Sequence, residues 1–392
     1  MIASNGFSST QDTRTATREA LRHALEKLAE PPGCGLIFAS ARHPLPDVLE
    51  EAQQILGSVP VIACHTAGEY TEAGLTRGGL VVLLLSSASI LCSSHFAPDV
   101  GEVELAAQQL SQDFSQRSAE ARSLGLGLST TLLLADGMPG TGEQLLQALQ
   151  RHTRMFQSIL GGAAGDDGAF QSPWVGSDQG SGPGAASALQ IFHQRPWGVG
   201  IGHGLKPQTP PMKVTRASGN VLYELDGRPA FEAYQAYAAS RGISLSPEDT
   251  RFLMENELGV MILNQVHHAR APVGVGPDGE LKLVAQVPTG GSVCILHGDP
   301  EAMTEACRQA AEAAREGLGG SKAAAVIVFD CVCRGAILGD AFDREIAALR
   351  SIFPDTPICG FLTYGEIART GGRLDGWHNT TCVVVAVPAR FA

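Results

Sequence analysis

A short segment near the start of the chain recurs near its end without a gap, and this repeat constrains the fold more than any other feature. Residues 60–70 (PVIACHTAGEY) align position by position with residues 357–367 (PICGFLTYGEI). Residues 158–166 (SILGGAAGD) have the same order of short apolar strand, small residues, glycine and acid. Apolar strands also precede the outer two copies, at residues 36–40 and 327–331. Such internal similarity indicates a repeated unit of strand, helix, strand, glycine–acid loop and strand.

The glycine–acid loop of each unit is expected at the carboxyl end of a central strand, where open α/β sheets bind their ligands. Glycine allows the backbone to turn or to approach a ligand closely, and the acid can accept a hydrogen bond from a ligand or cap backbone N–H groups. Two interpretations therefore stay open, a ligand pocket on which the loops converge and a structural turn that was copied three times. The first makes the following loop residues ligand-binding candidates: His65, Thr66, Gly68, Glu69, Gly162, Gly165, Asp166, Asp167, Tyr364, Gly365 and Glu366.

Alternation of helical and strand patterns along the chain predicts an α/β fold, in which helices pack on mixed sheets in two related domains. The first fifteen residues are rich in Ser and Thr and are expected to be disordered, and a helix is expected from about residue 17 to residue 28. The Pro-rich stretch at residues 206–211 is the best candidate for a domain boundary. The expected division is a disordered segment plus helix over residues 1–30, one domain over 31–208 and a second over 209–392.

Composition excludes several classes of protein. The 392 residues carry a net charge of −12, which disfavours nucleic acids and anionic membranes as partners, since both need a basic face. The apolar run at residues 80–85 is far shorter than a membrane-spanning helix, and the N-terminus lacks the pattern of a secretory signal. The nine cysteines are scattered, with no C-x-x-C motif. We therefore expect a cytoplasmic protein with reduced thiols.

Two further groups of chemically active residues precede the copy of the unit at residues 357–367. Arg334, at the carboxyl end of a strand, could bind a carboxylate or phosphate, and together with Glu366 it would supply both charges that recognise an amino acid. It could equally form a structural ion pair with Glu366. Cys331 and Cys333 alternate in the expected strand, so one thiol should be buried and the other could line the cleft.

These segments together resemble the FIST domains, named for F-box and intracellular signal transduction proteins. Residues 159–167 and 64–69 resemble the N-terminal FIST domain, and residues 214–230 resemble the start of the C-terminal one. Residues 329–335, 360–367 and 378–381 resemble its end. The resemblance covers about residues 33–388 and implies a sensory, small-ligand-binding module of bacterial signalling, with amino acids or other polar metabolites as ligands. It also points to His378 and Asn379, beside the last loop, as ligand-binding candidates.

Some free-standing members of this family bind haem as nitric oxide sensors, so haem is a possible cofactor, with His65, His203 and His378 as candidate axial ligands. The resemblance leaves no residues for an output domain, so a signal would pass to a separate protein such as a histidine kinase or a cyclase. The leading hypothesis is a ligand-binding sensor without catalytic activity or a metal. The alternatives are an enzyme, a hydrolase or transferase that uses the Glu, Asp and Cys cluster, and an interaction scaffold. No nucleophile elbow, Walker A or dinucleotide-binding motif is present.

Overall fold

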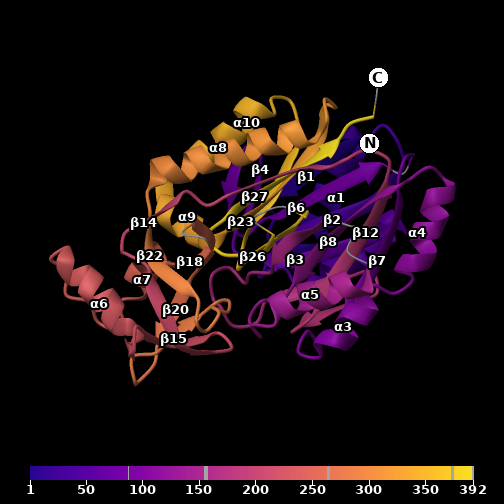
Figure 1. The fold of residues 1–392 in the computed structure, drawn as a ribbon. Coiled ribbons are helices and arrows are strands. Elements are labelled where there is room, and N and C mark those ends of the chain that lie inside the picture. The colour runs from indigo at the N-terminus through magenta and orange to yellow at the C-terminus, as the bar shows by residue number, and fades with distance from the viewer. Residues whose placement is uncertain (87, 154–157, 263–264, 372–374, 391–392) are drawn as a thin grey trace.

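The computed structural model describes residues 1–86, 88–153, 158–262, 265–371 and 375–390. Their strands form three six-stranded sheets, here called the three-sheet body, and one nine-stranded sheet. The nine-stranded sheet comes from one stretch of chain, residues 205–298, and is called the inserted sheet. In Figure 1 the inserted sheet lies to one side of the body, and the first and last described residues lie together at the opposite side.

The first six-stranded sheet has the order β1-β6-β2-β3-β10-β11, and consists of β1 (Ala3–Ser8), β2 (Pro32–Ser40), β3 (Val61–Thr66), β6 (Leu80–Ser86), β10 (Trp174–Ser177) and β11 (Gly180–Pro183). The second has the order β26-β25-β9-β8-β12-β7, and consists of β7 (Leu91–Ala97), β8 (Leu128–Ala135), β9 (Ser158–Ala163), β12 (Ala186–His193), β25 (Glu366–Arg369) and β26 (Gly376–His378). The third has the order β13-β27-β23-β24-β4-β5, and consists of β4 (Glu69–Thr71), β5 (Gly74–Thr76), β13 (Gly198–Gly202), β23 (Ala323–Cys331), β24 (Ile358–Thr363) and β27 (Cys382–Pro388).

The inserted sheet consists of β14 (Leu205–Pro207), β15 (Met212–Ser218), β16 (Val221–Leu225), β17 (Arg228–Pro229), β18 (Leu258–Ile262), β19 (Gln265–Arg270), β20 (Pro272–Val275), β21 (Leu281–Leu283) and β22 (Ser292–Gly298). Two helices belong to it, α6 (Ala230–Ser240) and α7 (Thr250–Glu255). The other helices are α1 (Thr13–Lys27), α2 (Leu45–Leu56), α3 (Val103–Leu110), α4 (Phe114–Ser123), α5 (Gly142–His152), α8 (Pro300–Gly317), α9 (Val332–Leu338) and α10 (Asp343–Ile352), with a 3-10 turn at Gly339–Phe342.

The outer helices cover the outer faces of the three body sheets. Helices α1 and α2 pack together on the first sheet, α3 and α5 pack together at the second, and α8 packs on β13 and β27 of the third. The approach of α8 to β13 is close, because a Cβ on Gly200 would lie 1.8 Å from the carbonyl oxygen of Ala310. The glycine-rich run of β13 therefore serves helix packing.

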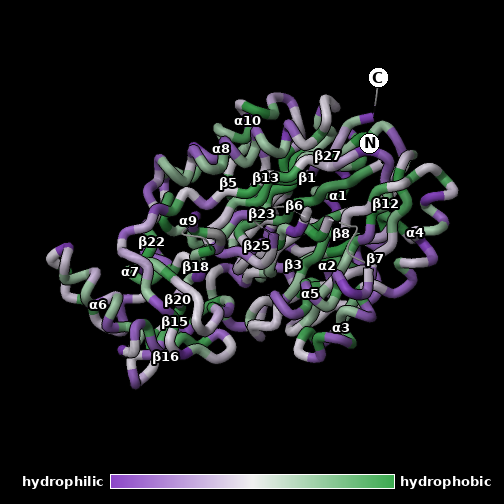
Figure 2. Tube along the Cα trace, viewed as in Figure 1, coloured by the Kyte–Doolittle hydropathy of each residue, from purple (hydrophilic) through white to green (hydrophobic). Residues whose placement is uncertain are grey.

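The inner faces of the body sheets share a central core. In β2, Phe38 points into this core and Ile37 points to the helices. In β23, Phe329 likewise points into the core and Val328 points to the helices. The Phe38 ring lies 4.6 Å from the Phe361 ring of β24, measured between centroids. Because both faces of the central strands are buried, they read as continuous apolar runs, which Figure 2 shows as green segments inside the body.

Each repeated unit sends a two-stranded hairpin into the sheet of another unit. The hairpin β4–β5 follows β3 along the chain but pairs with β24 of the third sheet. The hairpin β25–β26 follows β24 but pairs with β9 of the second sheet, and β10–β11 follows β9 but pairs with β3 of the first. The exchange is cyclic, so the three units form a ring in which each sheet is completed by a neighbour.

The predicted α/β class, with helices on mixed sheets, two related domains and repeated strand–helix–strand–loop–strand units, is confirmed. The helix expected from about residue 17 to residue 28 is present as α1. The expectation that the first residues are disordered is wrong, because they form β1, paired antiparallel with β6. Polar groups of β1 are bonded inside the fold: Ser4 donates to the Ala24 carbonyl at 2.7 Å, and Asn5 donates to the Ile358 carbonyl at 2.8 Å. The domain boundary at residues 208/209 stays a prediction.

Candidate functional site

The three glycine–acid loops meet at the carboxyl ends of the central strands and are bonded into a ring. Each loop forms backbone hydrogen bonds with the strand end of the preceding unit, the first loop bonding to the third unit. These bonds run from Ala67 N to Leu362 O (3.0 Å), Leu362 N to Gly68 O (2.7 Å), Tyr364 N to Ala163 O (3.1 Å), Ala163 N to Gly365 O (2.6 Å), Gly165 N to His65 O (2.9 Å) and Asp167 N to Thr66 O (2.8 Å). The sequence thus predicted correctly that the three copies lie at equivalent places.

The bonding pattern also fixes how the second copy aligns with the other two. Gly165 N donates to the preceding unit as Ala67 N and Tyr364 N do. In the outer two copies the glutamate lies two residues after this donor. The residue two positions after Gly165 is Asp167, so Asp167, rather than Asp166, is equivalent to the two glutamates. Asp167 is exposed, and its carboxylate accepts a hydrogen bond from the Ser40 hydroxyl at 2.8 Å.

Glu69 is fully buried and bonded within its own unit. Its carboxylate accepts hydrogen bonds from the Thr66 hydroxyl and from the Gly79 N–H, the latter at 2.9 Å. Burial raises the pKa of Glu69 to about 7, and the two hydrogen bonds reduce that rise. The carboxylate therefore joins the loop to the start of β6.

Glu366 repeats this arrangement in the third unit. The Thr363 hydroxyl donates to its carboxylate at 2.5 Å, and the Thr381 N–H donates at 3.1 Å. Burial raises the pKa of Glu366 well above its ordinary value. Both glutamates thus cap strand ends, as the structural interpretation of the repeat predicts.

The glycines of the ring allow close packing. A Cβ on Gly165 would lie 2.6 Å from the backbone nitrogen of Ala67, and one on Gly162 would lie 2.7 Å from a methyl carbon of Thr363. Around Gly68 and Gly365 the space is filled by Leu362 and by Trp377. The ring is therefore a packed junction, and any ligand must lie beside it.

Tyr364 connects the third loop with the second. Its hydroxyl donates to the Asp166 carboxylate and accepts hydrogen bonds from the backbone N–H groups of Asp166 (3.2 Å) and Gly168 (3.1 Å). Burial alone would raise the pKa of Asp166, but the bonds from Tyr364 and from three backbone N–H groups outweigh it and lower that pKa. The Phe170 ring stacks on the Tyr364 ring at 4.1 Å between centroids, with an interplanar angle of 11°.

A cavity of about 450 Å³ lies beside this aromatic pair, between the body and the inserted sheet. The body lines it with Gly137, Met138, Phe170 and Tyr364, which follow the carboxyl ends of β8, β9 and β24. The inserted sheet and α7 line it with Asn220, Thr250, Met254, Val273, Leu283 and Val284. Its volume is that of a small-molecule site, and it occupies the place where α/β sheets bind ligands. Of the sequence-predicted residues, Tyr364 lines it directly.

Arg334 is in a structural cluster instead of pairing with Glu366. It is fully buried and forms ion pairs with Asp330, at 2.9 Å, and with Glu345 of α10. It also donates to the carbonyl oxygens of His203 and Met303. Burial alone would lower the pKa of Arg334, but the carboxylates hold it well above its ordinary value. The cluster links β23, α8 and α10.

Cys331 and Cys333 do not alternate in one strand, contrary to the prediction. Strand β23 ends at Cys331, and α9 begins at Val332, so both thiols turn into one small apolar cluster with Ala271 of the inserted sheet. Burial raises the pKa of Cys331 well above its ordinary value. A thiol held neutral in this way is a poor nucleophile.

Of the three histidines considered for haem, His65 and His378 are buried and His203 is half-buried. His65 bonds to the His43 carbonyl oxygen at 3.0 Å, and the ring of His378 lies 4.9 Å from that of His268. His203 accepts from Leu205 N at 3.0 Å, and burial lowers its pKa to about 4. None of the three lines either of the two cavities described in this section. Likewise, no group of three or more His, Cys, Asp and Glu residues in the described parts of the chain could hold a metal ion.

Asn379 is 1% exposed, and among the described residues neither polar atom of its amide has a hydrogen-bond partner. The neighbouring Thr380 donates to Glu257 of the inserted sheet. Burial raises the pKa of Glu257 to about 8. Asn379 thus lies where the body meets the inserted sheet, as the cavity does.

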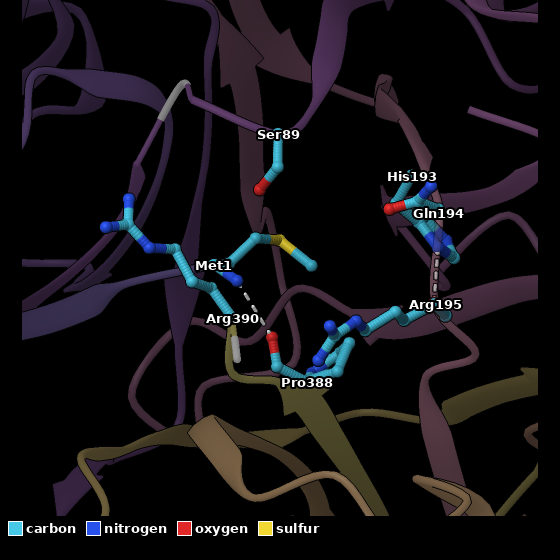
Figure 3. Close-up of a pocket in the computed structure, with 7 residues that line it drawn as sticks. All are labelled: Met1, Ser89, His193, Gln194, Arg195, Pro388 and Arg390. Atoms are coloured by element: carbon cyan, nitrogen blue, oxygen red, sulfur yellow. Dashed lines mark hydrogen bonds between the residues drawn. The ribbon is translucent and has the colours of Figure 1, made fainter. Parts of the chain in front are cut away.

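A second cavity, of about 300 Å³, lies where the chain ends meet (Figure 3). It is lined by Met1, Ser89, His193, Gln194, Arg195, Pro388 and Arg390. Its cationic groups are bonded to the protein: the Met1 amine donates to Pro388 O, Arg195 donates to Ala389 O, and Arg390 pairs with Glu30. The cationic groups around this pocket thus already have partners within the protein. The pocket is therefore a weaker candidate for a ligand site.

Sequence reasoning missed most of the residues that line the larger cavity. Phe170 carried the one available signal, an aromatic residue just after the turn that follows Asp166 and Asp167. Asn220 and Thr250 come from the inserted sheet and α7, whose position against the body no local pattern reveals.

Models of two protein domains match the chain. The FIST N domain matches residues 33–228, and the FIST C domain matches residues 230–369. Their junction falls at the start of α6, within the inserted sheet region.

Individual relatives are distant. An uncharacterized protein of Mycobacterium bovis is 27% identical over 183 residues, which are 44% of this chain and 46% of the relative, so the chain matches about half of that protein's length. An uncharacterized protein of Mycobacterium tuberculosis is 24% identical over 415 residues, 98% of each chain. Among solved structures, a chorismatase aligns over 99% of this chain and 98% of its own, with 10% identity and a TM-score of 0.37.

Proposed function

The chain belongs to the FIST family, whose domains are associated with the sensing of small ligands in signal transduction, and from this premise we propose that it is a sensor that binds its ligand in the cavity beside Tyr364. The observation that carries the proposal is the position of that cavity. It lies at the carboxyl ends of the body strands, and its other wall is the inserted sheet.

A ligand in this cavity would contact both parts of the molecule at once. It would therefore favour the arrangement in which the inserted sheet and the body stand at the present separation, since a ligand shifts an equilibrium by its differential affinity for two states. Ligand binding would thus increase the fraction of molecules in this arrangement. A separate cytoplasmic signalling protein, such as a histidine kinase or a cyclase, would recognise it. No helix among the described residues is long and apolar enough to cross a membrane.

The other residues predicted from the sequence lie near the cavity without lining it. Glu366 is bonded to Thr363 and to Thr381 N, on either side of the loop that carries Tyr364, and Asn379 lies in the same junction between body and inserted sheet. The enzyme alternative finds less support, because Glu69, Glu366 and Cys331 are buried and the carboxylates are bonded to backbone N–H groups.

The test is a thermal-shift screen of a metabolite library with a cavity-filling variant and a matched control. Val273→Trp places a large side chain in the cavity, and Leu105→Trp places one on α3, where Leu105 is 52% exposed. At a ligand concentration of 100 Kd, binding stabilises a protein by about 2.7 kcal/mol, which is readily seen as a rise in Tm. We expect a hit that raises the Tm of the wild type and of Leu105→Trp but leaves that of Val273→Trp unchanged. An equal rise in all three proteins would place the ligand elsewhere and refute the proposal.

A further inference from the structure

The rim of the cavity carries an unusual concentration of exposed apolar side chains. Met138 is 43% exposed, Phe170 39% and Val273 46%, and all three line the same cavity. They come from three different segments, two in the body and one in the inserted sheet. Large apolar side chains that gather in this way around a cavity mark a binding site for an apolar molecule.

Phe170 is held in its place at a conformational cost. Its φ is +54°, in the left-handed region that a bulky residue rarely adopts. The strain is opposed by hydrogen bonds from Phe170 N to the Asp166 carboxylate at 2.7 Å and to the Tyr364 hydroxyl at 3.4 Å. Strained residues that the surroundings fix so firmly cluster at ligand sites.

Both rings of the aromatic pair line the cavity. Tyr364 covers one face of the Phe170 ring, so the exposed part of Phe170 is its other face and its edges. A flat ring can stack on that face as a third layer. Aromatic rings attract each other in offset stacks beyond what their buried area alone provides.

The polar groups of the cavity are few and neutral. Among the described lining residues none carries a charge, and the inserted sheet and α7 contribute the amide of Asn220 and the hydroxyl of Thr250. The Asn220 amide nitrogen donates to Leu283 O at 3.1 Å, which leaves its carbonyl oxygen available as an acceptor. An amino acid would bring an ammonium and a carboxylate into this site, and burying these charges without partners is costly.

We propose that the cavity takes a flat, uncharged, aromatic molecule that stacks on Phe170 and donates a hydrogen bond to Asn220. This inference rests on the proposed function, because it names the class of ligand for the same site. It differs from the amino acids and polar metabolites that the family resemblance implies.

Saturation-transfer NMR with indole as the probe tests the ligand class. Indole is flat and neutral, carries one N–H donor, and is small enough that the expected affinity is within the range this method detects. Cyclohexanol serves as the non-aromatic control compound, and L-leucine and L-glutamate serve as the amino acids. The proteins are the wild type, Phe170→Leu and Phe114→Leu. Phe114 is a matched control because its ring, on α4, packs at a tilt against Phe192 and does not line the cavity.

We expect saturation transfer to indole alone, and an indole affinity that falls about three- to tenfold in Phe170→Leu, the effect of losing one aromatic stacking contact. Phe114→Leu should bind indole as the wild type does. If the amino acids bind and Val273→Trp abolishes their binding, the ligand class is wrong while the sensor function stands. If indole binds equally to all three proteins, or if no probe binds, the aromatic site is refuted. The metabolite screen with Val273→Trp then decides the proposed function separately.

Discussion

Replacing Glu69 with Gln tests whether the glycine–acid loops hold the fold together or hold a ligand. Gln has the same shape and can accept a hydrogen bond from Gly79 N while it donates one to the Thr66 hydroxyl, so the junction is kept. What changes is that the side chain no longer titrates. The difference between the two proteins therefore isolates the buried carboxyl.

The size of the effect follows from the pKa. Burial raises the pKa of Glu69 to about 7 in the folded protein, whereas an unfolded chain has a Glu pKa of about 4.3. The folded state thus holds a proton that the unfolded state releases, so stability is greatest below the unfolded pKa and is lost as pH rises through the folded pKa. Linkage gives a loss of about 2.5 kcal/mol between pH 5 and pH 8 from this one group.

Urea unfolding of the wild type and of Glu69→Gln at several pH values from 5 to 8 measures this effect. The free energy of unfolding of the variant, relative to the wild type, should rise by about 2.5 kcal/mol over that range. Glu248→Gln, in an exposed position, controls for the loss of one negative charge. Parallel pH profiles for the wild type and Glu69→Gln would refute a buried, proton-binding role for Glu69. Loss of ligand binding in a stable Glu69→Gln protein would assign it to the binding site instead.

The remaining predictions concern the packing around the site. Arg334→Met leaves Asp330 and Glu345 buried without their cation and should lower the free energy of unfolding by about 3–5 kcal/mol, measured by urea denaturation; a loss below about 1 kcal/mol would contradict the structural role of the cluster. Gly165→Ala forces a Cβ against the neighbouring loop and should destabilise the protein by about 1–3 kcal/mol or more, while Gly182→Ala, where the space is open, should be nearly neutral. Equal effects of the two glycine substitutions would contradict the packed ring.

The repeat in the sequence predicted the equivalence of the three loops, because the same local pattern produces the same strand ends. It could not predict which sheet each hairpin joins. The hairpin β25–β26 pairs with β9, which lies some two hundred residues earlier, and that choice depends on how the three units pack. Cyclic exchange of hairpins is a property of the assembled body and has no local signal.

Whether the predicted role of a candidate residue agrees with the structure depends on its neighbours in space. Arg334 was expected to meet Glu366, but its partner Glu345 lies on α10, which packs beside α8. The wrong strand assignment of Cys333 has a local cause, since Val332 and Cys333 are as apolar as the strand before them. Tyr364 is a ligand-binding candidate from its place in the repeat, and its side chain lines the cavity.

A crystal structure of the protein with the strongest compound from the metabolite screen would show where the ligand binds. We expect ligand density between the body and the inserted sheet, against the stacked rings of Phe170 and Tyr364. Ligand density in the pocket lined by Met1 and Arg390, or on any other surface, with no ligand in the cavity beside Tyr364, would contradict the proposed binding site.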